Sequence, residues 1–401
     1  MLERRRRAFR QLYKLMVLLI FHRGDRHLML RIQKRLIKEI VRVEKQIRRT
    51  KNRLRKLTLP DGTIPTSKTR KAAEIEERIE ELRYLNYIWR SFGDAVLFIH
   101  LDKYALKQAY YKTHSAAPKQ DAGFLSGKSG LKAEIAGVRQ LLSQGVPAIL
   151  CDVTNTVRFG DVCTMAGSDP RFVEVKSGSS RNTRARRQAA DIKKLHDFFD
   201  NDVIDNLRGN PQVHRLEMGV DEVSHTEIMN ECIAEARMTR GAVRNPEPGL
   251  YYAAMFDGAD IEAIMTQMTA SQGVAFQLNE VKSQRAWAPY YPFMLSIPRY
   301  EDLYDFVRGE LVLFVLFDIE SMRLKLEEHP NLKATLSKED DYPIRYSLGD
   351  GSYQGGVSRH FLTRIGLEFL SPTTVVNYLR HSIETADPLL AKSVGSKGAP
   401  T

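Results

Sequence analysis

The stretch that decides the fold runs from Gly160 to Lys176 and reads GDVCTMAGSDPRFVEVK. Apolar residues on both sides of its central turn, at residues 167–170, predict two short strands over residues 159–165 and 171–176. Periodic apolar residues also predict one more strand before this pair and a helix on each side of the three, over residues 147–153, 131–143 and 183–200. The expected order is therefore helix, three strands, helix.

A symmetric hairpin about this turn places three polar side chains on one face of the sheet. In that register Asp161 lies opposite Glu174, and Phe159 lies opposite Lys176. Because side chains alternate along a strand, Asp161, Glu174 and Lys176 then share a face. A one-residue bulge in either strand would break this alignment.

Two carboxylates beside a lysine suit metal-dependent phosphoryl chemistry. Asp161 and Glu174 supply the oxygen ligands that Mg²⁺ or Mn²⁺ prefers, and the Val175 carbonyl offers another. Such a metal polarises a phosphoryl oxygen and lowers the pKa of a bound water. Lys176 would orient that water and neutralise charge in the transition state. The alternative is a surface hairpin in which Lys176 pairs with one of the two acids.

Gly160-Asp161 followed by Glu174-Val175-Lys176 resembles the signature of the PD-(D/E)XK nuclease superfamily, with Gly160 where the name-giving form has proline. The resemblance covers less than a quarter of the 401 residues. It implies a restriction-endonuclease-like core of α-β-β-β-α-β order. It also implies that Asp161, Glu174 and Lys176 are catalytic.

Residues of the two flanking helices match the superfamily pattern as well. Glu134, in the helix before the first strand, would be an additional metal ligand, and Gln188, in the helix after the lysine, would contact the catalytic residues. Cations near the expected site could hold the phosphate backbone of a substrate, and we expect this of Lys128, Arg181, Arg184 and Arg187. The alternative for the arginines is a solvated helix face.

The positive charge of the chain is concentrated at its N-terminus. The net charge is +12, yet residues 1–56 contain 20 Lys and Arg against four acids, a net charge of +16, which leaves −4 for the rest. A basic helix can bind nucleic-acid phosphates by releasing counterions. With 43% hydrophobic and 27% charged residues, we expect a globular chain.

The basic segment is predicted to form a helical hairpin with the acidic segment that follows it. A seam of 4-3 spacing runs through Leu36, Ile40, Val43, Ile47, Leu54 and Leu57, and a second one through Ile75, Ile79, Leu82 and Trp89. Opposite charges beside the seams favour antiparallel pairing. Two interpretations stay open: the basic helix contacts nucleic acid, or the acidic helix neutralises it. These helices also offer a surface for a second copy or a partner protein.

Neither a membrane span nor a disulfide framework is expected. The longest early apolar run, residues 15–21, is far shorter than a membrane span and predicts a buried helix segment. The three cysteines have no C-x-x-C spacing. A reduced, cytoplasmic setting is the simplest interpretation.

The expected fold class is α+β or α/β. The segments are a basic helical arm, a nuclease-like core, a mixed α/β C-terminal domain of unassigned role and a flexible tail, over residues 1–118, 119–245, 246–385 and 386–401.

Three other features carry weaker signals. Residues 122–129, AGFLSGKS, fit a loose phosphate-binding loop around Lys128, but the polar segment before them is not a strand, as such a loop requires. A flexible entry to the next helix is the preferred interpretation. The aromatic segment 287–293 either packs a core edge, which we favour, or stacks on bases. Asp152 either joins the metal ligands or is only hydrogen-bonded.

The sequence thus predicts a metal-dependent nuclease, with a DNA endonuclease of restriction or phage-defence type as the expected form and DNA preferred over RNA. The competing hypothesis is a non-catalytic nucleic-acid- or partner-binding protein with a structural nuclease-like core. A nucleotide-driven enzyme that uses Lys128 is the third. The similarity of layout to antiviral defence effectors is an analogy at the level of the fold.

Overall fold

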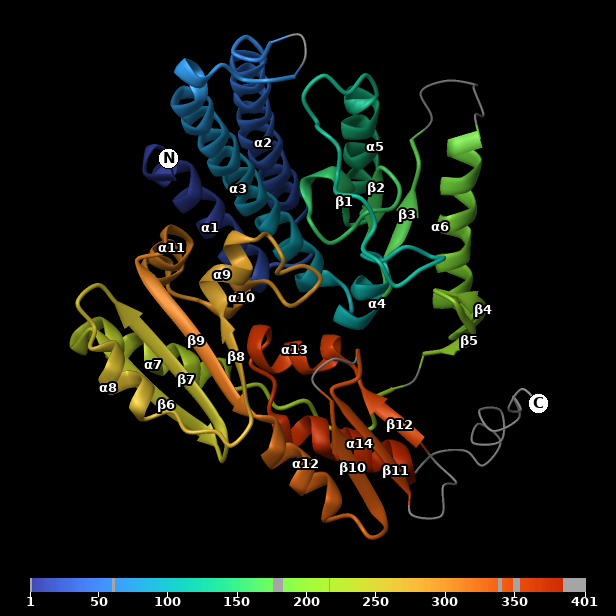
Figure 1. The fold of residues 1–401 in the computed structure, drawn as a ribbon. Coiled ribbons are helices and arrows are strands. Elements are labelled where there is room, and N and C mark those ends of the chain that lie inside the picture. The colour runs from blue at the N-terminus through green and yellow to red at the C-terminus, as the bar shows by residue number, and fades with distance from the viewer. Residues whose placement is uncertain are drawn as a thin grey trace. The chain divides into compact units, whose positions relative to one another are not determined.

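The computed structural model describes residues 2–59, 62–175, 183–215, 217–337, 341–348 and 354–384, apart from the side chains of Arg184 and Ala185. The chain divides into two compact units, one of residues 1–215 with 285–295 and one of residues 216–284 with 296–401. Both are mixed α/β, and the sheets of the described residues are antiparallel (Figure 1). The expected boundaries at residues 118 and 245 fall within these units rather than between them. The expected tail lies outside the described residues.

Three helices open the first unit: α1 (Arg6–Phe21), α2 (Arg26–Arg55) and α3 (Thr69–His100). The expected hairpin is present, because α2 and α3 pack along each other and bury the seam residues Leu36, Ile40, Val43 and Ile47. α1 packs on the same pair through Phe9, whose ring lies 5.1 Å from that of Phe92. Shorter helical elements of this unit are η1 (Leu2–Arg5), η2 (Thr66–Lys68) and α4 (Lys103–Gln108).

The apolar run at the end of α1 is only partly buried. Met16 and Leu19 face the core, whereas Leu18, Ile20 and Phe21 are exposed. The helical period places Leu18 and Phe21 on the side of α1 away from Met16 and Leu19, whereas Ile20 lies next to Met16 around the helix and is exposed all the same. The expectation of a buried segment is therefore wrong for these three residues. Within the described part of the chain, no helix is long and apolar enough to cross a membrane.

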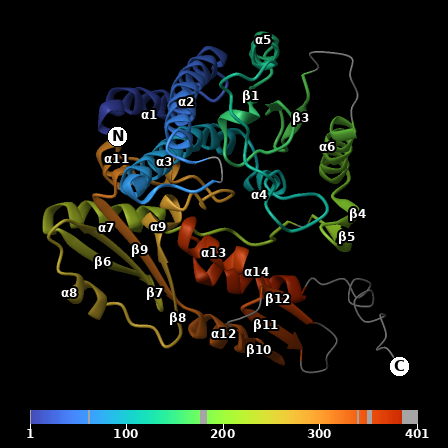
Figure 2. The same cartoon turned by 45° about the horizontal axis from the view of Figure 1, so that its top comes forward.

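A small antiparallel sheet follows α5 (Leu131–Ser143). Its strands lie in the order β1 (Ala148–Leu150), β2 (Val162–Thr164) and β3 (Arg171–Val173). The pairs Val162–Val173, Cys163–Phe172 and Thr164–Arg171 have the register expected for the symmetric hairpin. α6 (Thr183–Asn201) lies beside β3 (Figure 2). Its His196 ring is stacked on that of Phe172. The order helix, three strands, helix is therefore the expected one.

Two features of this region differ from the expectation. The first strand ends at Leu150, and residues 151–153 form a 3₁₀ turn, η3 (Cys151–Val153), instead of continuing the strand. The strand after α6, β4 (Val203–Leu207), pairs with β5 (Asn210–His214) in a separate sheet. Among the described residues, a fourth strand does not join β1–β3.

The N-terminal helices hold this sheet in place. The Gln33 side-chain amide of α2 donates to the Ala148 carbonyl at 2.8 Å and accepts from the Leu150 N–H at 3.1 Å, so it pairs with the free edge of β1. On α3, Gly93 allows the Val153 carbonyl of η3 to approach closely, because a Cβ at position 93 would overlap that oxygen. The helical hairpin and the sheet therefore share one packed interior.

The described residues of the second unit form two sheets. One has the strand order β6 (Gly241–Glu247), β7 (Leu250–Phe256), β9 (Leu311–Asp318) and β8 (Gly273–Gln277), and the other is β10 (Leu332–Leu336), β11 (Ile344–Leu348) and β12 (Gln354–Val357). The helices of this unit are α7 (Thr226–Thr239), α8 (Ile261–Thr266), α9 (Leu278–Ser283), α11 (Tyr300–Arg308), α12 (Ile319–Glu327), α13 (Arg359–Leu367) and α14 (Pro372–Glu384).

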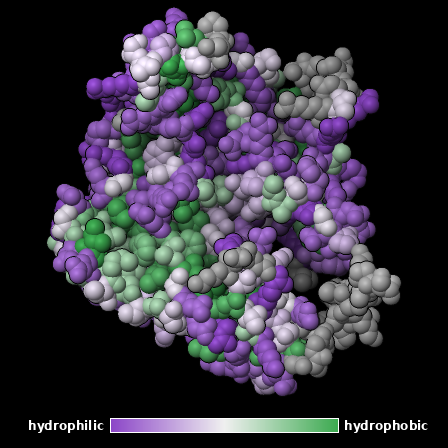
Figure 3. All heavy atoms as spheres, viewed as in Figure 1, coloured by the Kyte–Doolittle hydropathy of each residue, from purple (hydrophilic) through white to green (hydrophobic). Residues whose placement is uncertain are grey.

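One face of the larger sheet carries partly buried apolar side chains. They pack around Ala253, Ile264 and Met268 and include Val243, Tyr251, Met255, Phe314 and Leu316. Figure 3 shows apolar side chains gathered over this sheet.

Candidate functional site

Three carboxylates from three different elements converge on one cation. The Lys128 ammonium lies 2.9 Å from Glu134 Oε1, 2.8 Å from Asp152 Oδ2 and 3.2 Å from Asp161 Oδ1. We call Lys128, Glu134, Asp152 and Asp161 the carboxylate cluster. Two of the acids, Glu134 and Asp161, are residues expected at the site from the sequence.

Each acid of the carboxylate cluster is placed by a different feature of the backbone. Glu134 stands in the first turn of α5. Asp152 lies in the η3 turn that ends β1, and Asp161 precedes β2. The Asp161 N–H donates to the Val173 carbonyl at 2.9 Å, and its carbonyl accepts from the Cys151 N–H at 3.0 Å. Asp161 is therefore fixed between both neighbouring strands.

Gly160 explains why this chain departs from the proline of the resembled signature. Its φ is +67°, in the left-handed region, and a Cβ there would lie only 3.1 Å from the Val173 carbonyl oxygen. Proline holds φ near −65° and cannot adopt this conformation. A glycine meets the requirement because it has no Cβ.

The carboxylate cluster is half-open to solvent and electrostatically coupled. The side chain of Glu134 is 4% exposed, that of Asp161 24% and that of Lys128 28%. Burial raises the pKa of Glu134, and the nearby Asp161 and Asp152 raise it further, while Lys128 opposes the shift. Burial lowers the pKa of Lys128, but hydrogen bonds to Asp152 and Glu134 outweigh this and raise it. The ammonium thus balances carboxylates that would repel one another.

The structure describes the other residues expected at the site only in part. The paired register of β2 and β3 ends at Val162–Val173, one residue short of Asp161 and Glu174, so the pairing of these two acids stays a prediction; Glu174 is half-buried. The Val175 N–H donates to Asp161 Oδ2 at 3.0 Å. Lys176 lies outside the described residues. Gln188 is half-buried in the N-terminal half of α6.

The expected phosphate-binding cations are only partly described. Arg187 is exposed on α6, but Arg181 and the side chain of Arg184 lie outside the described part. Lys128 is turned into the carboxylate cluster. No strand directly precedes its loop, so the arrangement required for a phosphate-binding loop is not present there.

The sequence reasoning missed a buried ion pair that supports the carboxylate cluster. Arg90 of α3 lies 3.3 Å from the carboxylate of Glu44 on α2, and its guanidinium donates to the Asp152 carbonyl at 3.1 Å. The Glu44 carboxylate also accepts from the Ser126 N–H at 2.7 Å, close to Lys128. One signal was available: α2 contains only two acids, and Glu44 is one of them, next to the apolar seam.

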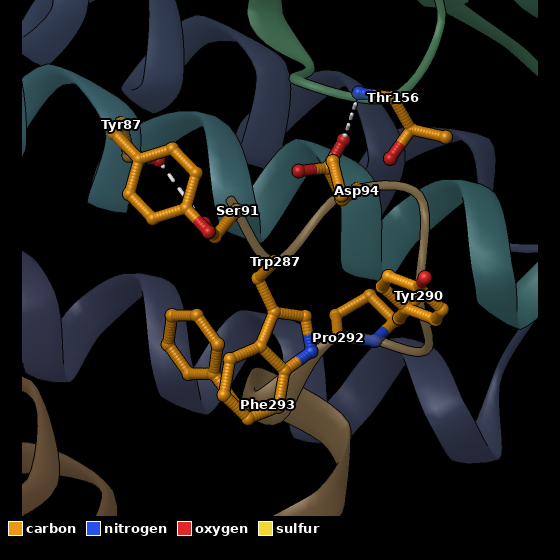
Figure 4. A pocket seen from close by; sticks show the side chains of 9 residues that line it. Tyr87, Ser91, Asp94, Thr156, Trp287, Tyr290, Pro292 and Phe293 are labelled. Atoms are coloured by element: carbon orange, nitrogen blue, oxygen red, sulfur yellow. Dashed lines mark hydrogen bonds between the residues drawn. The ribbon is translucent and has the colours of Figure 1, made fainter. Parts of the chain in front are cut away.

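A second buried acid, Asp94 of α3, fixes the loop after η3. Its carboxylate accepts from the N–H groups of Asn155 and Thr156 at 2.8 and 2.9 Å, and Figure 4 shows the bond from Thr156. Burial raises the pKa of Asp94, although these hydrogen bonds oppose the shift. Close by, the aromatic segment 287–293 is packed against α3, with Trp287 and Phe293 buried. Packing therefore accounts for these aromatic side chains, as favoured from the sequence.

Among the described residues, no group of three or more His, Cys, Asp and Glu side chains is arranged to hold a metal ion. The carboxylates of Glu134, Asp152 and Asp161 surround an ammonium instead. Carboxylate oxygens are the ligands that Mg²⁺ and Mn²⁺ prefer. Three ionised carboxylates carry more negative charge than the single Lys128 ammonium neutralises, and the remaining negative charge favours a second cation.

Comparison of the chain with protein-family models, with curated proteins and with solved structures finds no match. The chemistry of the carboxylate cluster therefore has to be inferred from its own geometry.

Proposed function

We propose that this chain is a metal-dependent nuclease that hydrolyses phosphodiester bonds, with a core of PD-(D/E)XK type. A DNA endonuclease of the restriction or phage-defence kind is the form we favour. The observation that carries the proposal is the convergence of Glu134, Asp152 and Asp161 on one cation. The order α5, β1, β2, β3, α6 supports it, while the separate pairing of β4 is a departure from the superfamily core.

Magnesium or manganese would be held by Glu134, Asp152 and Asp161, joined by Glu174, the residue after β3. When bound, it would polarise a phosphoryl oxygen and lower the pKa of a bound water. Asp161 is suited to this role because hydrogen bonds on both sides fix its backbone. A ligand held in one position loses little conformational freedom when it binds.

Two lysines have separate roles in this proposal. Lys128 neutralises the carboxylates in the resting protein and would contact the scissile phosphate when substrate and metal are present. A lysine is a compact cation that can turn from a carboxylate to a phosphate within the reach of its flexible side chain. Lys176 would orient the attacking water, as the resemblance implies.

The competing hypothesis keeps the same fold without catalysis. In that case Lys128 is a permanent structural partner of the three acids, and the protein binds nucleic acid or a partner protein. The exposure of Lys128, 28%, favours the catalytic hypothesis, because a phosphate group can approach a cation that solvent already reaches.

The test is cleavage of supercoiled plasmid DNA and of RNA with Mg²⁺ or Mn²⁺, each compared with EDTA. We expect metal-dependent nicking of DNA, and we expect Asp161→Asn and Glu134→Gln to lower its rate by about 100-fold or more. Glu231→Gln, an exposed acid of α7, is the matched control. Unchanged nicking by Asp161→Asn would show that the site is assigned wrongly. A wild-type protein that cleaves neither nucleic acid would leave the non-catalytic hypothesis.

A further inference from the structure

We propose that one face of α2 binds the phosphate backbone of double-stranded DNA and directs it to the carboxylate cluster. This face, the α2 stripe, consists of Lys34, Lys38, Lys45, Arg48 and Arg49. The inference deepens the proposed function, and it rests on that function for the cleavage of the bound DNA. It favours one of the two interpretations left open for the basic helix, that it contacts nucleic acid, and it names the residues and the kind of nucleic acid.

The α2 stripe is a continuous feature of the helix. All five of its side chains are exposed. At 3.6 residues per turn they fall within a sector about 100° wide. From Lys34 to Arg49 the stripe extends along the helix axis for about 22 Å, at 1.5 Å per residue.

No carboxylate among the described residues forms an ion pair with a member of the α2 stripe. The cations in the adjoining sector of α2 differ, because Arg35 and Arg42 both pair with the buried Glu39. The acidic side chains of α3 do not neutralise the stripe either. Glu74, Glu80 and Glu81 pair with arginines, namely Arg70, Arg83, Arg78 and Arg285. The stripe thus keeps its charge for an external partner.

The face of α2 next to the stripe is anchored to the candidate site. Gln33 holds β1, and Glu44 holds the backbone of Ser126, two residues before Lys128. The guanidinium of Arg48 lies 5.5 Å from the ring centre of Phe124, in the same loop. α1, by contrast, lies on the other side of α2 from α5 in both views of the fold (Figures 1 and 2). The stripe therefore has a fixed position beside the carboxylate cluster.

Its chemistry favours duplex DNA. A straight row of cations about 22 Å long matches roughly two thirds of a helical turn of B-DNA, which rises by about 34 Å. Lysine and arginine contacts to phosphates fix the register of a protein on a duplex without reading sequence. Binding of single strands depends on aromatic side chains that stack on bases. The 30 residues of α2 include no Phe, Tyr or Trp.

The test compares wild type, the triple variant Lys34→Gln/Lys38→Gln/Lys45→Gln and the control Arg4→Gln/Arg7→Gln/Lys14→Gln. Both triples remove three exposed charges, but the control changes only the first two helical elements, η1 and α1. The probes are a labelled random-sequence duplex DNA, the matching duplex RNA and the single-stranded DNA, in EDTA at several salt concentrations. Circular dichroism confirms that each variant is folded.

We expect the α2 triple to weaken duplex DNA binding about 10- to 100-fold and to lower the slope of log Kd against log salt by up to about three. The control triple should bind nearly as wild type. Unchanged binding by the α2 triple, equal losses in both triples, or a loss seen only with RNA or single-stranded DNA would each overturn the proposal.

These outcomes are separable from those of the proposed function. Stripe-dependent DNA binding by a protein that never cleaves would support the surface and remove the nuclease proposal. Metal-dependent cleavage by a protein whose DNA binding does not depend on the α2 stripe would support the nuclease proposal and overturn the proposed DNA-binding surface.

Discussion

The ammonium nitrogen of Lys128 lies 2.8 Å from Oδ2 of Asp152, in a direct ion pair between a loop and the turn that ends β1. The same nitrogen contacts Glu134 and Asp161, so one side chain neutralises acids from three elements. This relationship gives the carboxylate cluster a resting state without a divalent ion. Any metal that enters must compete with the Lys128 ammonium for the same oxygens.

Lys128→Met should make the protein depend on a divalent ion. Without the ammonium, the three carboxylates repel one another, and we expect the free energy of unfolding in EDTA to fall by about 1–3 kcal/mol. Mn²⁺ should then raise the thermal midpoint more than it does in wild type, because the competing cation is gone. Thermal melts with EDTA and with Mn²⁺ measure both effects.

The matched control for this variant is Lys132→Met, an exposed lysine of α5. It should leave both the midpoint and its response to Mn²⁺ unchanged. Equal responses to Mn²⁺ in wild type, Lys128→Met and Asp161→Asn would show that the carboxylate cluster does not bind the metal.

Arg90→Leu should be strongly destabilising. It leaves the Glu44 carboxylate, which is fully buried, without its cation, and such a loss costs about 3–5 kcal/mol. Urea unfolding measures the change. The double variant Glu44→Gln/Arg90→Leu should recover part of it, since no buried charge remains. Arg83→Leu, at an exposed position of the same helix, should cost no more than about 1 kcal/mol. A double variant no more stable than Arg90→Leu would contradict this account.

Gly93→Ala tests the close approach of α3 to the η3 turn. The added methyl group would overlap the Val153 carbonyl oxygen, so helix or turn must shift, at a cost of about 1–3 kcal/mol. The shift would also move Asp152, and metal-dependent cleavage should fall with stability. Gly24→Ala is the control, because a Cβ there meets no atom within 4 Å. Urea unfolding in which both variants match wild type would rule out the tight contact.

Lys282 predicts a pH dependence of stability in the second unit. Burial lowers the pKa of Lys282 to about 7, and its ammonium position faces the Phe306 carbonyl and ring. The unfolded lysine has a pKa near 10.4, so between about pH 7 and pH 10 the unfolded chain binds the extra proton. The free energy of unfolding should therefore rise with pH in this window, by at most about 1.4 kcal/mol per unit.

Urea unfolding at several pH values, for wild type and Lys282→Met, measures this contribution as a difference. Groups other than Lys282 titrate in both proteins and cancel. The free energy of unfolding of wild type should increase relative to that of the variant as the pH rises above 7. A difference that stays constant between pH 7 and pH 9 would refute the prediction.

Local patterns were sufficient to predict several parts of this structure. The seam through Leu36, Ile40 and Val43 predicted the α2–α3 hairpin, because apolar residues at heptad spacing form a stripe that packs against a second helix running alongside. The symmetric turn at residues 167–170 predicted the register of the hairpin, which the pairs Val162–Val173 and Cys163–Phe172 confirm. These features depend on residues close together in the chain, and short-range sterics and periodicity determine them.

Other features required contacts between distant segments. Lys128 was expected to contact substrate phosphates, yet its ammonium is at the centre of the carboxylate cluster. The Arg90–Glu44 pair that supports the cluster had no sequence motif. The partner of a buried charge is decided by which helices pack together, since desolvation forces each charge to find an opposite one.

The sequence by itself determined the register of the β2–β3 hairpin, because the symmetric turn fixes which residues pair and a strand's period of two residues fixes which side chains share a face. Only the tertiary structure decided that α2 and α3 are part of the same unit as this hairpin. It also decided that the α2 stripe keeps its charge while Glu39 and Glu44 are neutralised inside. Helix periodicity determines which residues lie on the same side of a helix, but packing against other elements decides which side is buried.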